Sequence, residues 1–207
     1  MGNATGSTEQ PLNSLWLDAG NLSLANNDPV ISWADVSGNS NTAVQATGSL
    51  QPTFKTAQIN GLPTVFFDGS EYLTIPDDDI LDITNGITVI VVAKPNSPDA
   101  LPRGLVSKRI NLSSERAYSL FTYTSSNLYF DVASNRINGT VTATADAQIF
   151  SGNYNGSISN PRSKVYNDGT QSGAGNGPVS VGNKSSDLYI GCLLYTSPSP
   201  RDRTRSR

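Results

Sequence analysis

Short runs in which apolar and polar residues alternate, each ended by turn residues, recur along most of this chain. In NLYFDVA, the apolar residues Leu128, Phe130 and Val132 alternate with Tyr129 and Asp131, and EYLTIP shows the same pattern. Successive side chains of a strand point to opposite faces of its sheet. The alternation therefore predicts strands with an inward apolar face and an outward polar one.

The turns between these runs strengthen the prediction. KVYNDGTQ carries Asp168-Gly169 between strand-like flanks, which indicates a hairpin. PDDDILDIT could form one short helix, and the apolar run GITVIVVAKP, ended by Pro95, is typical of a central strand covered on both faces. With about a dozen short strands and no βαβ alternation, the sequence predicts an all-β, antiparallel, two-sheet sandwich or barrel.

Charge narrows the partners that such a domain could bind. The formal net charge is -3, and four of the 14 basic residues lie in the last seven positions, so the rest of the chain is more acidic. An acidic body with scattered bases argues against nucleic acid and anionic membranes. Since no apolar run reaches the ~18 residues of a membrane span, membrane insertion is not expected.

Three stretches carry a family resemblance: WADVSGNSN, INGLPTVFFDGSEYL and the strand that ends in AKP. Their order and spacing resemble the concanavalin A-like lectin/glucanase superfamily, in its bacterial laminin-G-like form, over residues 14–191. The resemblance implies a two-sheet jelly roll that binds carbohydrate or mediates adhesion within a larger secreted or surface protein. Some members bind calcium, and others in the superfamily are glycoside hydrolases. Residues 1–13 fit a linker from an upstream domain.

The end of the chain departs from this pattern. Relatives continue past LYIG with another strand or two, whereas this chain switches to CLLYTSPSPRDRTRSR. Residues 192–207 resemble translated sequencing-adapter DNA, and we expect them to be a non-native, disordered tail. The domain would then lack its last strand or strands. The alternative is a genuine basic tail.

Catalysis is not expected. Most glycoside hydrolases use two carboxylates about 5–9 Å apart, and the glucanase branch carries them as E-x-D-x-(x)-E on one strand. That pattern is absent, and Glu71 and Glu115 each stand alone. The chain has no histidine, which excludes Ser-His-Asp and Cys-His catalysis and zinc sites of the usual His/Cys type within it.

Two loops could bind calcium, which takes oxygen ligands from carboxylates, amides and carbonyl groups. DVSGNSN offers Asp35, Asn39 and Asn41, and FDGSE offers Asp68. Such side chains also close turns through their own hydrogen bonds. No cofactor is required, and both readings of these loops stay open.

A sugar site needs an exposed aromatic ring, against which the apolar face of the sugar packs, and polar partners for its hydroxyl groups. The candidates are outward aromatic residues and their polar neighbours: Tyr118, Tyr123, Tyr129, Arg116, Asp131 and Asn153. Alternatively, these tyrosines only cover the second face of a sheet.

Together these features predict a non-catalytic carbohydrate-binding or adhesion module of a larger extracellular or surface-attached bacterial protein. Its partners would be a polysaccharide or glycan and the neighbouring domains of that protein. The alternative is a structural spacer or protein-interaction domain without a sugar site, and a divergent glycoside hydrolase is a remote third. No signal peptide is visible at the N-terminus.

Overall fold

The computed structural model describes residues 13–82, 84–94, 103–109, 116–123, 127–141 and 146–192. Its regular elements are β-strands and short 3₁₀ helices, which confirms the predicted all-β sandwich. No helix in the described residues is long and apolar enough to cross a membrane. Several predictions fall on residues that lie outside the described ones: Glu115, Pro95, residues 1–12 and residues 193–207.

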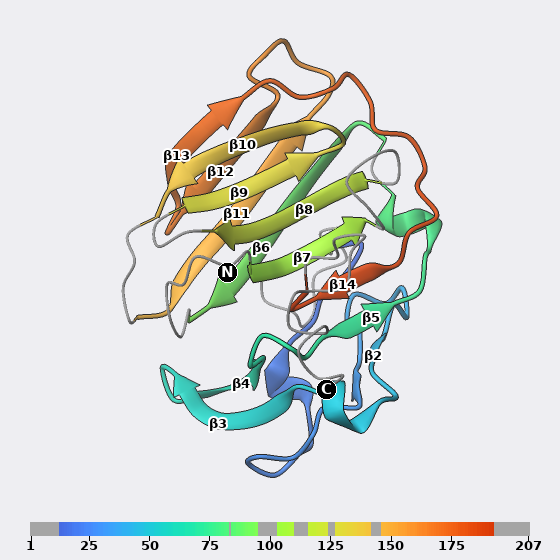
Figure 1. The fold of residues 1–207 in the computed structure, drawn as a ribbon, viewed down its shortest axis with the longest axis vertical. Coiled ribbons are helices and arrows are strands. Elements are labelled where there is room, and N and C mark those ends of the chain that lie inside the picture. The colour runs from blue at the N-terminus through green and yellow to red at the C-terminus, as the bar shows by residue number, and fades with distance from the viewer. Residues whose placement is uncertain are drawn as a thin grey trace, which may run out of the picture.

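The larger sheet has eight strands among the described residues, all paired antiparallel. Their spatial order is β1 (Ser32–Trp33), β2 (Ala43–Val44), β5 (Leu73–Ile75), β14 (Leu188–Ile190), β7 (Arg103–Arg109), β8 (Arg116–Tyr123), β9 (Asn127–Val132) and β10 (Asn135–Thr140). Strands β7 to β10 form the front layer in Figure 1.

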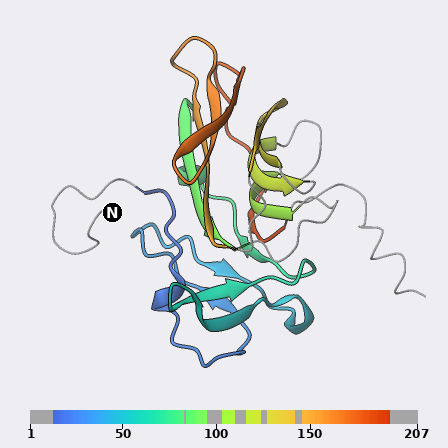
Figure 2. The same ribbon diagram turned by 90° about the vertical axis from the view of Figure 1, so that its left-hand side faces the viewer.

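The smaller sheet lies behind this layer, and Figure 2 shows the two sheets from the side. Its described strands, also antiparallel, are β13 (Thr170–Gly175), β12 (Ser163–Asn167), β11 (Gln148–Asn155) and β6 (Gly86–Ala93). A separate hairpin is formed by β3 (Thr53–Ile59) and β4 (Leu62–Phe66). In the described part of the chain, three 3₁₀ helices lie in the connections: η1 (Ala19–Asn21), η2 (Gly48–Leu50) and η3 (Asp79–Leu81).

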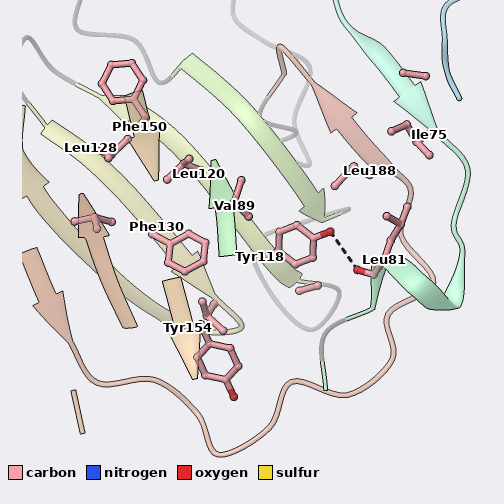
Figure 3. Close-up of a cluster of buried hydrophobic side chains, with 14 of the residues drawn as sticks. Ile75, Leu81, Val89, Tyr118, Leu120, Leu128, Phe130, Phe150, Tyr154 and Leu188 are labelled. Atoms are coloured by element: carbon pink, nitrogen blue, oxygen red, sulfur yellow. Dashed lines mark hydrogen bonds between the residues drawn. The ribbon is translucent and has the colours of Figure 1, made fainter. Parts of the chain in front are cut away.

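The core fills the space between the two sheets. Leu128, Phe130 and Val132 of β9 are fully buried there, as their alternation predicts. From the smaller sheet, Val89, Phe150 and Tyr154 point toward them (Figure 3). Burying a large apolar side chain is worth about 1.5–3 kcal/mol relative to leaving it exposed. The facing apolar stripes therefore hold the two layers together.

The two local predictions, a hairpin and a short helix, are both confirmed. Asp168 and Gly169 connect β12 to β13 with φ angles of 49° and 78°, the left-handed conformation of a tight hairpin turn. In the PDDDILDIT segment, η3 begins after Asp78, whose side chain accepts a hydrogen bond from the Ile80 N–H group at 2.9 Å. A short polar residue at this position is the usual start of a helical turn.

The prediction that GITVIVVAKP is a central strand covered on both faces is wrong. Strand β6 is an edge of the smaller sheet, and within the described residues it pairs with β11 alone. Val89 faces the core, while Ile90 and Val92 are 65% and 59% exposed. A run of β-branched residues indicates a strand, but it does not tell which strand lies beside it or what covers its faces.

The edges of the two sheets meet where β10 lies beside β13. A Cβ atom on Gly173 would collide with the carbonyl oxygen of Asn138, and one on Gly139 would collide with the hydroxyl group of Ser172. Glycine at these positions lets the two backbones approach closely. This contact closes one side of the sandwich.

Candidate functional site

A cluster of aromatic and charged side chains lies on the outer face of β8, β9 and β10. We call it the outer-face cluster, and its members are Phe121, Tyr123, Tyr129, Asp131 and Arg136. Phe121 lies directly opposite Tyr129 in the β8–β9 pairing, and Asp131 lies opposite Arg136 in the β9–β10 pairing. Directly opposite residues share a face of the sheet, so the strand register brings these side chains together.

The rings form a continuous row. The ring centroids of Phe121 and Tyr129 are 5.2 Å apart and the rings are nearly parallel, at 12°. Tyr123 follows at 6.1 Å from Tyr129, tilted by 55°. The guanidinium carbon of Arg136 lies 5.1 Å from the Phe121 centroid and 5.6 Å from the Tyr129 centroid. These distances are in the range of attractive cation–π contacts.

Asp131 fixes the position of the Arg136 guanidinium group. Its two carboxylate oxygens accept hydrogen bonds from Nε and Nη2 of Arg136, each at 2.7 Å. Nη1 of Arg109 donates to the same carboxylate at 3.4 Å. Asp131 and Arg109 are buried, and a bidentate pair of this kind restricts the guanidinium plane to one orientation.

Tyr123 and Arg136 are the most exposed members of the cluster, and Tyr129 is half-buried. The Tyr123 residue is 39% exposed and the Arg136 side chain 45%, while Phe121 is buried beneath them. An exposed aromatic ring beside a fixed array of N–H donors can pack against an apolar ligand face and donate hydrogen bonds to its oxygen atoms.

The structure brings together Tyr123, Tyr129 and Asp131 of the predicted sugar-binding set. It does not place Tyr118 with them, because that residue is 4% exposed and points into the core (Figure 3). Its hydroxyl group donates to the Leu81 carbonyl at 3.1 Å, and burial raises the pKa of the phenol. The prediction that Tyr118 faces outward is therefore wrong.

Asn153 and Arg116 also lie outside the outer-face cluster. Asn153 is on β11 of the smaller sheet, where its Nδ2 donates to the Thr88 hydroxyl at 2.9 Å. It is therefore not a neighbour of the tyrosines, contrary to the prediction. Arg116 begins β8 opposite Arg109 and is half-buried.

Two members of the cluster, Phe121 and Arg136, were not among the predicted residues. Both left a signal in the sequence. Phe121 alternates with Leu120, and Tyr123 lies two positions further along the same face. In DVASNR, a turn at Ala133 and Ser134 places Asp131 opposite Arg136. Opposite charges on either side of a short turn indicate such a cross-strand pair.

Asp35, the first of the predicted metal ligands, organises its own loop. Its carboxylate accepts hydrogen bonds from the N–H groups of Trp16, Ser37 and Asn41 at 2.9–3.0 Å, and from the Ser37 hydroxyl at 2.8 Å. Burial raises the pKa of this carboxyl, but these hydrogen bonds outweigh burial and leave the pKa below its ordinary value. The donors occupy both carboxylate oxygens.

The other three predicted ligands have similar contacts. The amide nitrogens of Asn39 and Asn41 donate to the Ser14 carbonyl at 3.2 and 3.4 Å. Asp68 accepts two hydrogen bonds from Ser70 at 2.7 Å, within a separate turn. The part of the chain that the structure describes holds no group of three or more His, Cys, Asp or Glu residues suited to a metal ion. Calcium binding stays a prediction.

No protein-family model matches this chain, and no curated protein matches it. Among solved structures, it is similar to domain 4 of AbnA, a GH43 extracellular arabinanase from Geobacillus stearothermophilus, solved in complex with arabinotriose. The TM-score is 0.54 at 12% identity, and the alignment covers 84% of this chain and 87% of that one. This likeness supports the β-sandwich fold.

Two further structures are more distant. The structure of botulinum neurotoxin type C that concerns its interaction with two ganglioside molecules aligns with a TM-score of 0.45 at 14% identity, over 82% of this chain and 44% of that one. The binding domain of serotype C1 gives 0.44 at 13%, over 83% and 45%. Scores of this size support no conclusion. The β-sandwich implied by the family resemblance is confirmed, and membership of the laminin-G-like family stays a prediction.

Proposed function

We propose that this chain is a non-catalytic carbohydrate-binding module that works outside the cell as one domain of a larger bacterial protein. The observation that carries the proposal is the outer-face cluster, in which Tyr123 and Arg136 are exposed on a fixed base of Phe121, Tyr129 and Asp131. A sugar would pack its apolar face on Tyr123 and accept hydrogen bonds from Arg136. The arabinanase domain of the same fold was solved with arabinotriose, which supports this ligand class.

The charged groups of the cluster favour binding over hydrolysis. A glycoside hydrolase needs one carboxylate as acid and a second as base or nucleophile. Asp131 is the carboxylate of the cluster, and its oxygens accept hydrogen bonds from two arginines. It is therefore placed to orient Arg136 rather than to transfer a proton.

A glycan array followed by calorimetric titration of any glycan that binds tests the proposal. Tyr123→Ala should weaken binding about 10-fold or more, equivalent to about 1.4 kcal/mol. Tyr166→Ala is the matched control, because Tyr166 is a half-buried tyrosine on β12 of the other sheet. It should bind like the wild type.

Other results would contradict the proposal. If no glycan binds with or without calcium, the alternative of a structural spacer or protein-interaction domain is favoured. Equal losses in the two tyrosine variants would place the site elsewhere. Binding that appears only when calcium is added would support the predicted metal loops, and Asp35→Asn should then abolish it.

A further inference from the structure

A second polar feature, a cleft of about 480 Å³, opens beside the contact between β10 and β13. Its lining includes two carboxylates, two amides and two hydroxyl groups: Asp146, Asp168, Gln148, Asn167, Thr140 and Thr170. Side chains of these types accept and donate hydrogen bonds to hydroxyl-rich ligands.

Hydrogen bonds hold part of this lining in place. Gln148 is buried, and its Nε2 donates to Oδ1 of Asn167 at 3.1 Å. Nδ2 of Asn167 donates to Asp168 at 2.9 Å, and Asp168 accepts the N–H group of Ile149 at 2.8 Å. Side chains fixed before a ligand arrives lose less conformational freedom on binding.

One row of paired residues connects the outer-face cluster to the edge of the cleft. Tyr123 on β8 lies opposite Asn127 on β9, and Asn127 lies opposite Thr140 on β10. Thr140 is exposed and lines the cleft. Neighbouring strands are about 4.8 Å apart, so the row spans roughly 10 Å between Tyr123 and Thr140. One extended ligand could contact both ends.

We propose that the cleft is a second subsite for the same glycan, and this inference rests on the proposed function. One sugar packs on Tyr123, the chain crosses β9, and a following sugar places its hydroxyl groups among the carboxylates and amides of the cleft. Because Asp146 and Asp168 are both acidic, the cleft favours neutral or amino sugars and disfavours sugars that carry a carboxylate.

Titrations with arabinose, arabinobiose and arabinotriose, and with the corresponding neutral series of any glycan that binds on the array, test the subsite. Wild-type affinity should rise about 10-fold from one sugar to three. The double variant Asp146→Ala/Thr140→Val should lose this gain and keep wild-type affinity for the single sugar. Tyr123→Ala should weaken binding at every length. Both residues of the double variant are exposed, and matching thermal midpoints will show that it folds.

A charge test examines specificity. A trisaccharide with a uronic acid at the cleft end should bind about 10-fold more weakly than its neutral counterpart, and Asp146→Asn should reduce this difference. If affinity does not change with length, or the double variant binds the trisaccharide like the wild type, the subsite is refuted. A loss in Tyr123→Ala would then leave the proposed function standing. Absence of binding at all lengths would refute both.

Discussion

Lys108 is a fully buried cation in the larger sheet. Its ammonium group forms ion pairs with Asp77 and with Asp82, the latter at 3.4 Å, and donates to the Ser186 carbonyl at 2.8 Å. Lys108→Met should lower the free energy of unfolding by about 3–5 kcal/mol, because Asp82 would stay buried without a cation. Urea denaturation measures this change. The control is Lys164→Met, at a half-buried site on β12, which should change the free energy of unfolding by less than about 0.5 kcal/mol. Equal losses in the two variants would contradict a stabilising role for the buried ion pairs of Lys108.

Tyr118 provides a test at high pH. Burial, together with the charge of Asp82, raises the pKa of this phenol in the folded protein, whereas the unfolded chain has a tyrosine pKa of about 10. Ionisation therefore favours the unfolded state, and stability should fall as pH rises above about 10. Tyr118→Phe should lose about 1 kcal/mol at pH 7 through the missing hydrogen bond to Leu81. Its denaturation midpoint should then fall less steeply than that of the wild type between pH 10 and 12. Parallel curves would contradict this.

Local chemistry made several elements predictable from the sequence. The hairpin at Asp168 and Gly169 and the inward face of β9 follow from nearest-neighbour rules, namely turn conformation and alternation. The same alternation separates Tyr118 from Tyr123, since five positions place them on opposite faces of β8. Applied strictly, it would have excluded Tyr118 from the site.

The side chains of strand β6 alternate between the core and solvent, although nearly all of them are apolar and the sequence shows no such alternation. A matched pair of variants tests this arrangement. Val89 faces the core at 9% exposure, and its neighbour Ile90 is 65% exposed. Val89→Thr should cost about 2 kcal/mol because it buries a hydroxyl group. Ile90→Thr keeps a β-branched side chain in solvent and should cost less than about 0.5 kcal/mol. Chemical denaturation separates the two, and similar losses would mean that β6 is covered on both faces after all.

At the scale of the whole molecule, the assignment of strands to sheets decides which predicted residues meet. Asn153 and Tyr129 both point outward, but β11 and β9 belong to different sheets. Pairing between strands far apart in the sequence depends on contacts across the whole core, so a local sequence pattern does not predict it. The sequence therefore predicts the fold class and the outward face of β9, whereas the composition of the outer-face cluster required the structure.

The closed side of the sandwich gives a final prediction. Gly173→Ala would place a Cβ atom against the Asn138 carbonyl oxygen, where β10 and β13 touch. Backbone cannot move aside as the end of a flexible side chain can, so this variant should lose about 2–3 kcal/mol, at the upper end of overpacking effects. Gly48→Ala is the control, since its added Cβ meets nothing within 4 Å outside its own turn of the chain, and it should stay within about 0.5 kcal/mol of the wild type. Because the cleft opens beside this contact, Gly173→Ala should also weaken trisaccharide binding more than monosaccharide binding. Wild-type stability in Gly173→Ala would show that the two sheets do not depend on this contact.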